Sequence, residues 1–112
     1  MKRIEAIIRP EKLEAVVAAL EAIGHSGMTA TDVRGHGRQR GMKELFRGRE
    51  YEVRFIPKVR IEIVVRDAFA EKAVEAIIAT SKTGQIGDGK IFVSDIADAI
   101  RVRTGERGDQ AV

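Results

Sequence analysis

Two stretches of the 112-residue chain decide its fold: Arg3-Ile4-Glu5-Ala6-Ile7-Ile8-Arg9 and Arg60-Ile61-Glu62-Ile63-Val64-Val65-Arg66. They are identical at four of their seven positions and apolar at the other three. Short runs rich in Ile and Val are typical of largely buried β-strands. The two stretches therefore predict one structural unit that occurs twice.

A helical pattern follows each predicted strand. Pro10 suits the first turn of a helix in which apolar residues recur at helical spacing. Asp67 is a suitable N-cap for a second helix that we expect to continue to about Ser81. Further strands are expected at 29–35 and 90–93. The order βαβ–βαβ predicts an α+β, ferredoxin-like fold, with both helices on one face of the sheet and the other face left for self-association.

Composition limits the class of protein. A chain of 12.3 kDa predicts a single domain. It contains no cysteine, which excludes a disulfide scaffold and a thiol nucleophile. No apolar run approaches the length of a membrane span, and the first residues do not resemble a signal peptide. We therefore expect a cytoplasmic protein.

The net charge of +3 is concentrated in one segment. Residues 36–58 contain seven basic and three acidic side chains, a net charge of +4, so the remaining residues sum to −1. A nucleic-acid partner is not expected, because the positive charge of a nucleic-acid-binding protein would extend over more of its surface than this one segment. The same 23 residues lack apolar periodicity and predict a long loop. A solvated insertion is one interpretation; a contact surface for a partner is the other, which we favour.

A glycine-rich stretch follows the second predicted helix: Thr83-Gly84-Gln85-Ile86-Gly87-Asp88-Gly89-Lys90. It is not a Walker A motif, because Ile91 stands where Ser or Thr would bind Mg²⁺ and because the order is helix–loop–strand. Closely spaced glycines nevertheless let backbone N–H groups converge on an anion, and a lysine adds charge. The alternative is a tight turn with no ligand.

Further cations favour the anion site. Arg38 lies among glycines at the start of the long loop, and Arg101 and Arg103 would point to the same side of an extended strand. Arginine suits phosphate because its planar guanidinium donates two parallel hydrogen bonds. Solvated surface arginines are the alternative. For the segment 96–103 we expect a short helix or an edge strand.

Residues for catalysis are sparse. His25 and His36 have no metal-ligand spacing, and no serine has an adjacent base in a recognisable motif. The chain has no asparagine, on which ferredoxin-like acylphosphatases rely. Phe92 is the only aromatic residue on a predicted central strand, which disfavours an RNA-binding sheet. We expect a binding protein; the alternative is a phosphatase or phosphotransferase that uses the glycine-rich stretch.

These residues together resemble the PII signal-transduction family, the trimeric nitrogen-status sensors, over nearly the whole chain. The resemblance is carried by Ile7-Ile8-Arg9-Pro10, Gly35-His36-Gly37-Arg38-Gln39, Tyr51, Pro57-Lys58-Val59, residues 83–92 and residues 101–106. It implies one PII-type domain over 1–112, with a T-loop at about 36–58, a phosphate-binding loop at about 82–90 and a C-terminal segment at about 96–112.

The resemblance also implies ligands. ATP and ADP would compete in each cleft between neighbouring subunits of a homotrimer. The implied nucleotide-binding residues are Gly35, Gly37, Arg38, Gly87, Asp88, Gly89 and Lys90, with Arg101 and Arg103 from the adjacent chain and Thr29 and Val64 near the adenine. 2-Oxoglutarate would bind beside Mg-ATP, with Gln39 coordinating Mg²⁺ and Lys58 pairing with the distal carboxylate. A PII-like sensor of a different effector is the alternative.

The T-loop is the implied output. Tyr51 aligns with the tyrosine that relatives uridylylate, and Arg47 with the arginine that enters an ammonium transporter pore. Other implied targets are a nucleotidyltransferase, a nitrogen-regulatory kinase and metabolic enzymes, so the membrane is reached only through a transporter. The chain departs from the common family pattern at Phe46, Arg49 and Gln85.

Overall fold

The structure is a computed structural model that describes residues 1–37, 42–46 and 49–112, and the side chains of residues 1–37 and 54–112. Its strands are β1 (Lys2–Ile8), β2 (Thr29–Gly35), β3 (Met42–Phe46), β4 (Arg49–Val53), β5 (Ile56–Val65) and β6 (Gly89–Asp95). Its α-helices are α1 (Leu13–Ala22) and α2 (Asp67–Ser81), and its 3₁₀ helices are η1 (Pro10–Lys12) and η2 (Gly108–Ala111).

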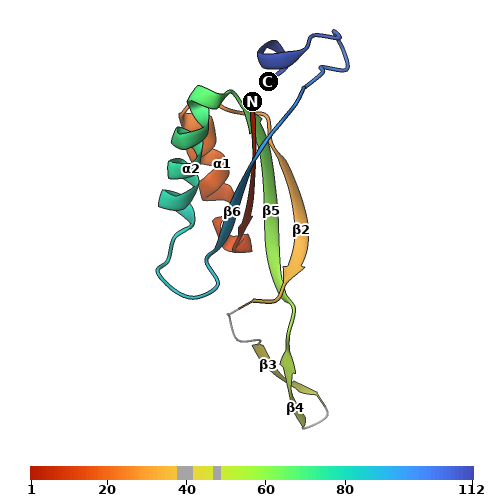
Figure 1. Cartoon of the computed structure of the whole chain (residues 1–112). Coiled ribbons are helices and arrows are strands. Elements are labelled where there is room, and N and C mark those ends of the chain that lie inside the picture. The colour runs from red at the N-terminus through yellow and green to blue at the C-terminus, as the bar shows by residue number, and fades with distance from the viewer. Residues whose placement is uncertain (38–41, 47–48) are drawn as a thin grey trace.

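Four strands form one antiparallel sheet in the order β2-β5-β1-β6. The central strand β1 pairs with both β5 and β6, and Ile4 lies opposite Ile63 on one side and Val93 on the other. Both α-helices lie on one face of the sheet (Figure 1). This order and layering confirm the expected ferredoxin-like fold.

The core lies between the sheet and the helices because buried and less buried residues alternate along Ile4–Ile8 of β1 and Val59–Val65 of β5. Val16 and Leu20 of α1 and Ala73 and Ile77 of α2 cover the buried set. The residues that alternate with the buried ones point to the other face of the sheet. That face carries charged side chains such as Arg3 and Glu62, and 3.9 Å separates Arg3 Nη1 from Glu62 Oε1. Burying a Leu or Ile side chain stabilises a fold by about 1.5–3 kcal/mol.

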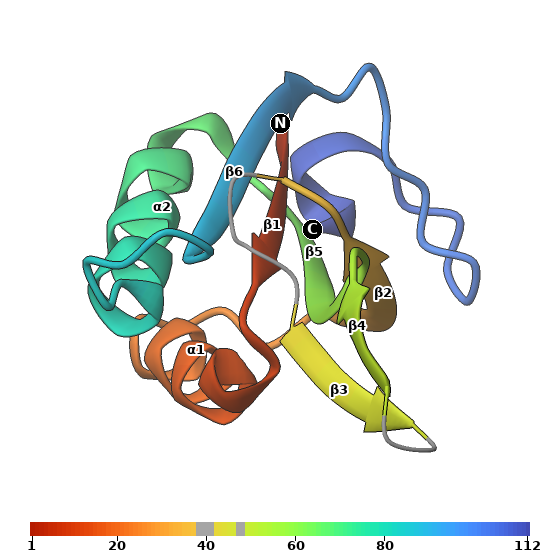
Figure 2. The same ribbon diagram turned by 90° about the horizontal axis from the view of Figure 1, so that it is seen from below.

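The long loop expected over 36–58 is partly wrong. Residues 56–58 belong to β5, which begins earlier than its apolar run indicates. Within the remaining segment, β3 and β4 pair as an antiparallel hairpin that projects from the end of the sheet (Figures 1 and 2). The hairpin escaped prediction because β3 lacks apolar alternation and both strands are rich in charge, although Tyr51 and Val53 alternate with glutamates in β4. Lys43 lies opposite Glu52 and Glu44 opposite Tyr51.

The C-terminal segment forms neither the edge strand nor the helix expected over 96–103. Gly105, at a φ of +72°, reverses the chain, and Arg101 N donates to Glu106 O over 2.9 Å. One isolated bridge joins Ile100 to Arg107, and η2 follows. Among the described residues, no helix is long and apolar enough to cross a membrane.

Two adjacent residues of α2 test the core. Ile77 is 1% exposed and Ile78 is 48% exposed. Ile77→Ala is expected to lower the free energy of unfolding by about 2–5 kcal/mol, because it removes buried atoms and leaves a cavity. Ile78→Ala is the matched control, with the same change of side chain on the same helix, and should cost much less. Urea denaturation at one protein concentration measures both, and equal losses would contradict this account of the core.

Candidate functional site

A groove lies beside residues 82–90, here called the glycine loop, at the end of the sheet from which the β3–β4 hairpin projects. Its volume is about 720 Å³, and its walls come from β1, β2, β5, β6 and the glycine loop. We call it the loop groove. It brings together seven residues predicted from the sequence: Gly35, Gly37, Lys58, Gly87, Asp88, Gly89 and Lys90.

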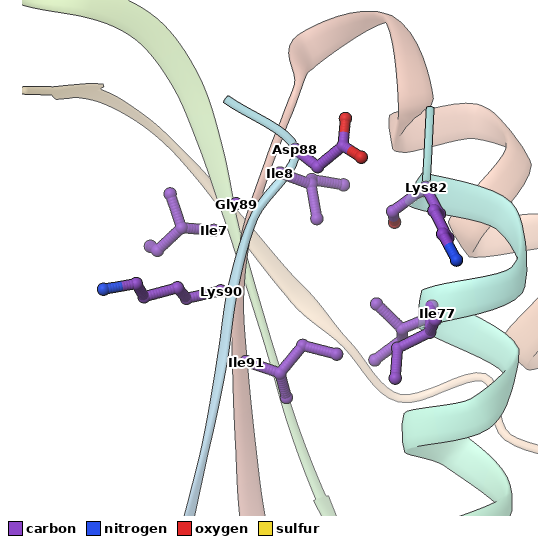
Figure 3. Close-up of a pocket in the computed structure, with 10 residues that line it drawn as sticks. Ile7, Ile8, Ile77, Lys82, Asp88, Gly89, Lys90 and Ile91 are labelled. Atoms are coloured by element: carbon purple, nitrogen blue, oxygen red, sulfur yellow. The ribbon is translucent and has the colours of Figure 1, made fainter. Parts of the chain in front are cut away.

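Lys90 and Asp88 take opposite sides of the β6 backbone. Figure 3 shows Lys90 pointing away from α2, on the same side as Ile7, whereas Asp88 points toward the helical side. Ile8, Ile77 and Ile91 line a smaller hollow of about 260 Å³ between α2 and the sheet (Figure 3). The ammonium group of Lys90 is therefore directed to the helix-free face of the sheet, where an anion has access to it.

Gly89 is required where the glycine loop enters β6. Its φ is +109°, and a Cβ atom there would lie 1.7 Å from the backbone oxygen of Ile7. The close pairing of β6 with β1 thus leaves no room for a side chain. The glycine at position 89 thus fixes the position at which the glycine loop ends and β6 begins.

A second hollow lies at the other end of the sheet. Its volume is about 550 Å³, and it is lined by Thr29, Val64 and Arg101 together with the C-terminal Ala111 and Val112. We call it the tail hollow. It holds three of the four residues that the sequence assigned to the adjacent chain or to the adenine; Arg103 lines neither hollow.

One chain does not bring the two sets of residues together. Lys58 of the loop groove and Val64 of the tail hollow are six residues apart in β5, a distance of roughly 20 Å along an extended strand. Lys90 and Arg101, both predicted to bind the same phosphates, accordingly lie in separate hollows. The two sets of predicted ligand contacts are therefore separate within one chain.

The carboxylate of Asp88 is held within the glycine loop. It accepts hydrogen bonds from Thr83 N over 2.8 Å, Gly84 N over 2.9 Å, the Thr83 hydroxyl, and Arg9 Nε over 3.2 Å. The hydrogen bond from the Thr83 side chain, followed by those from the two backbone N–H groups and Arg9, holds the pKa of this carboxyl well below its usual range. Asp88 is thus an anion that closes the turn.

Lys58 and Arg9 bind the glycine loop from the sheet. Lys58 is only 8% exposed, and its Nζ donates to Gly87 O over 2.7 Å. Burial, and then the nearby Arg9 guanidinium, lower the pKa of the Lys58 ammonium. Arg9 also donates to Ile86 O over 3.0 Å. Arg9 is a site residue that was not predicted from the sequence; it reaches the glycine loop because β1 pairs with β6, which brings the end of β1 beside that loop.

The expectation that Arg101 and Arg103 lie on an extended strand is wrong. The reversal at Gly105 turns residues 102–104 into a loop. The Arg101 guanidinium donates to Glu106 Oε1 over 2.8 Å and to Gln110 O over 3.1 Å. The two arginines therefore lie at a turn, and Glu106 partly compensates the charge of Arg101.

Three predicted site residues, Arg38, Gln39 and Arg47, lie outside the described residues. Tyr51 lies in β4, opposite Glu44, and its side chain is outside the described part. No group of three His, Asp or Glu side chains that could hold a metal ion occurs among the residues searched, those that the structure describes.

Comparison with known proteins decides the family. The sequence profile of the family Nitrogen regulatory protein P-II matches residues 1–106. The chain belongs to the P-II family. It is 58% identical over 112 residues to the Nitrogen regulatory protein P-II of Rhodospirillum rubrum, and 57% identical to that of Klebsiella oxytoca and to Nitrogen regulatory protein P-II 1 of Escherichia coli K12. Each match covers 100% of both chains.

Membership of the P-II family confirms the resemblance seen in the sequence and gives the chain a nitrogen-regulatory, signalling role. P-II proteins carry the name of regulators, and that name indicates no catalytic activity.

The Asp88 carboxylate gives a pH dependence with a definite sign. Its pKa is lowered in the folded protein, so its ionised form stabilises the fold at every pH above the ordinary value of about 3.9. This contribution is lost as the pH falls toward the folded pKa. The difference in unfolding free energy between the wild type and Asp88→Asn should therefore be constant from pH 7 to pH 5 and shrink below about pH 4.

Urea denaturation across this pH range measures the difference. Asp32→Asn, which removes an exposed carboxylate on β2, is the control and should give a smaller difference. A difference that grows on acidification would contradict the stabilising role of the ionised carboxylate.

Proposed function

We propose that this P-II protein is a trimeric sensor that binds ATP or ADP in each cleft between neighbouring subunits. The separation of the loop groove and the tail hollow along β5 carries the proposal, because residues for one polyphosphate lie at opposite ends of one sheet. In a trimer, the loop groove of one subunit would face the tail hollow of the next. The nucleotide would contact Gly35, Gly37, Arg38, Gly87, Asp88, Gly89 and Lys90 of one subunit and Thr29, Val64, Arg101 and Arg103 of its neighbour.

The chemistry of the loop groove supports a polyphosphate ligand. Glycines at positive φ allow backbone N–H groups to turn toward an anion, and Lys58 and Lys90 supply positive charge. The one carboxylate in the glycine loop is paired with the Arg9 guanidinium and accepts hydrogen bonds from within the loop. A charge-assisted hydrogen bond contributes on the order of 1.5–3 kcal/mol, so a few of them support micromolar affinity.

The second ligand we propose is 2-oxoglutarate, bound beside Mg-ATP. Gln39 would coordinate Mg²⁺ through its amide oxygen, and Lys58 would pair with the distal carboxylate. Lys58 as a whole is only 8% exposed, and it lines the loop groove, where a carboxylate would be partly shielded from water. Mg²⁺ binding by oxygen donors of this kind, together with phosphates, follows its general preference.

The proposed output is the T-loop. The β3–β4 hairpin projects beyond the sheet, which supports its use as a contact surface (Figure 1). Tyr51 would be the site of nucleotidylation, and Arg47 would contact an ammonium transporter. Binding of a ligand at the base of the hairpin would change target affinity by favouring one hairpin conformation over another.

Titration calorimetry with ATP, and then with 2-oxoglutarate in the presence and absence of Mg-ATP, tests the sensor. The expected result is 2-oxoglutarate binding only in the presence of Mg-ATP. Lys58→Ala should remove the 2-oxoglutarate signal while ATP still binds. If ATP binds to the wild type and 2-oxoglutarate does not, the effector is a different one.

Mixed trimers test whether the site is shared between subunits. Lys90→Ala and Arg101→Ala should each weaken ATP binding by roughly 10- to 100-fold, as the loss of one charge-assisted hydrogen bond predicts. When the two variants are unfolded and refolded together, some clefts combine an intact Lys90 with an intact Arg101. These clefts should recover wild-type affinity. Mass spectrometry shows whether the trimers are mixed. If mixed trimers do not recover wild-type ATP affinity, Lys90 and Arg101 belong to a site on one chain.

A further inference from the structure

Asp88 lines the loop groove, yet its carboxylate has no capacity left for a ligand. A carboxylate offers about four acceptor positions, two on each oxygen. In Asp88, Oδ1 accepts from the Thr83 hydroxyl and Arg9 Nε, and Oδ2 accepts from the N–H groups of Thr83 and Gly84. The side chain thus joins the start of the glycine loop to its end and to β1, and it cannot also bind a cation that accompanies a phosphate.

Basic side chains from the sheet hold three consecutive residues of the glycine loop. Arg9 donates to Ile86 O and to the Asp88 carboxylate, and Lys58 donates to Gly87 O. Arg9 is well placed for both contacts, because its side chain is only 17% exposed and follows directly after β1. The path of residues 86–88 is therefore fixed from one side.

These contacts determine where the backbone N–H groups point. In a trans peptide the C=O and N–H bonds are antiparallel, and no cis peptide bond occurs in the part of the chain that the structure describes. With Ile86 O directed at Arg9, the N–H of Gly87 points away from Arg9. With Gly87 O directed at Lys58, the N–H of Asp88 points away from Lys58. Neither N–H has a hydrogen-bond partner among the described residues.

We propose that Arg9 and the Asp88 carboxylate are positioning residues of the nucleotide site, which fix the glycine loop so that the Gly87 and Asp88 N–H groups meet the polyphosphate. The Asp88 carboxylate does not itself contact the ligand. This inference rests on the proposed nucleotide-binding function. It gives the Asp88 side chain a structural role within the glycine loop and leaves ligand contact to the Asp88 backbone N–H; it also adds Arg9, which acts through Asp88 and Ile86.

Calorimetry with ATP and ADP, with and without Mg²⁺, tests the positioning role. Asp88→Asn and Arg9→Gln should each lower ATP affinity by about tenfold, by the same factor with and without Mg²⁺, because no metal contact is lost. The double variant should lose less affinity than the product of the two single losses, since both changes break the same Arg9–Asp88 pair. Asp95→Asn is the matched control: it removes an exposed carboxylate, paired with Lys2, from the far end of the same strand. Its affinity should stay within about twofold of the wild type.

Two further measurements guard against a trivial loss of folding. In the ligand-free protein, amide hydrogen exchange of Thr83 and Gly84 should be at least tenfold faster in Asp88→Asn, with exchange in the core of β1 unchanged. Thr83→Ser keeps the hydroxyl and should bind ATP like the wild type, whereas the similarly shaped Thr83→Val should bind like Asp88→Asn.

The possible failures are distinguishable. If the wild type binds ATP and Asp88→Asn binds it equally or more tightly, the positioning role is overturned, because removing a negative charge beside phosphates would then be the main effect. Unchanged exchange at Thr83 and Gly84 overturns it as well. If the wild type itself binds no nucleotide, the proposed function fails, and with it any role of Arg9 and Asp88 in nucleotide binding.

Discussion

The antiparallel pairing of β1 with both β5 and β6 is the constraint on which the rest of the molecule depends. This register buries Ile4, Ala6 and Ile8 under the helices, and it sets Ile8 opposite Val59 on one side and Gly89 on the other. Because side chains alternate between the faces of a sheet, a shift of one residue would exchange the buried and exposed sets. The same register brings Arg9, Lys58 and the glycine loop to one end of the sheet. The packing of the core and the geometry of the candidate site thus have one cause.

Much of this arrangement could be predicted from the sequence, for reasons visible in particular residues. The β2 and α2 boundaries match the expected 29–35 and 67–81, because Ile and Val runs, the apolar stripe and Asp67 are local signals. The glycine loop was recognisable because three glycines and a lysine occur within seven consecutive positions, 84–90. The hairpin was not, because β3 and β4 pair largely polar and charged positions whose order becomes apparent only once β2 and β5 have brought their ends together.

The candidate site shows the same division between local and long-range information. Residue types that bind phosphate could be identified one by one, but the partners that already occupy them could not. Arg9 and Asp88 are 79 positions apart in sequence, and the turn that engages Arg101 with Glu106 depends on Gly105 at positive φ. Spacing cannot reveal whether a carboxylate faces a ligand or closes a turn. That distinction follows from counting the donors around it.

The way the T-loop leaves the sheet has a consequence for how such a protein can change. Gly35 lies opposite Ile56, so the two ends of the intervening segment are held about 5 Å apart by the sheet itself. The pairing of β2 with β5 therefore already holds the two ends of this segment together. Doubling the length of the segment would cost only about 0.6 kcal/mol in loop-closure entropy. Its sequence and length can therefore vary with little effect on the stability of the scaffold. A foreign recognition peptide can therefore be grafted between these two anchor residues with little effect on the stability of the scaffold, which on the proposed role of this segment would redirect the protein to a new target.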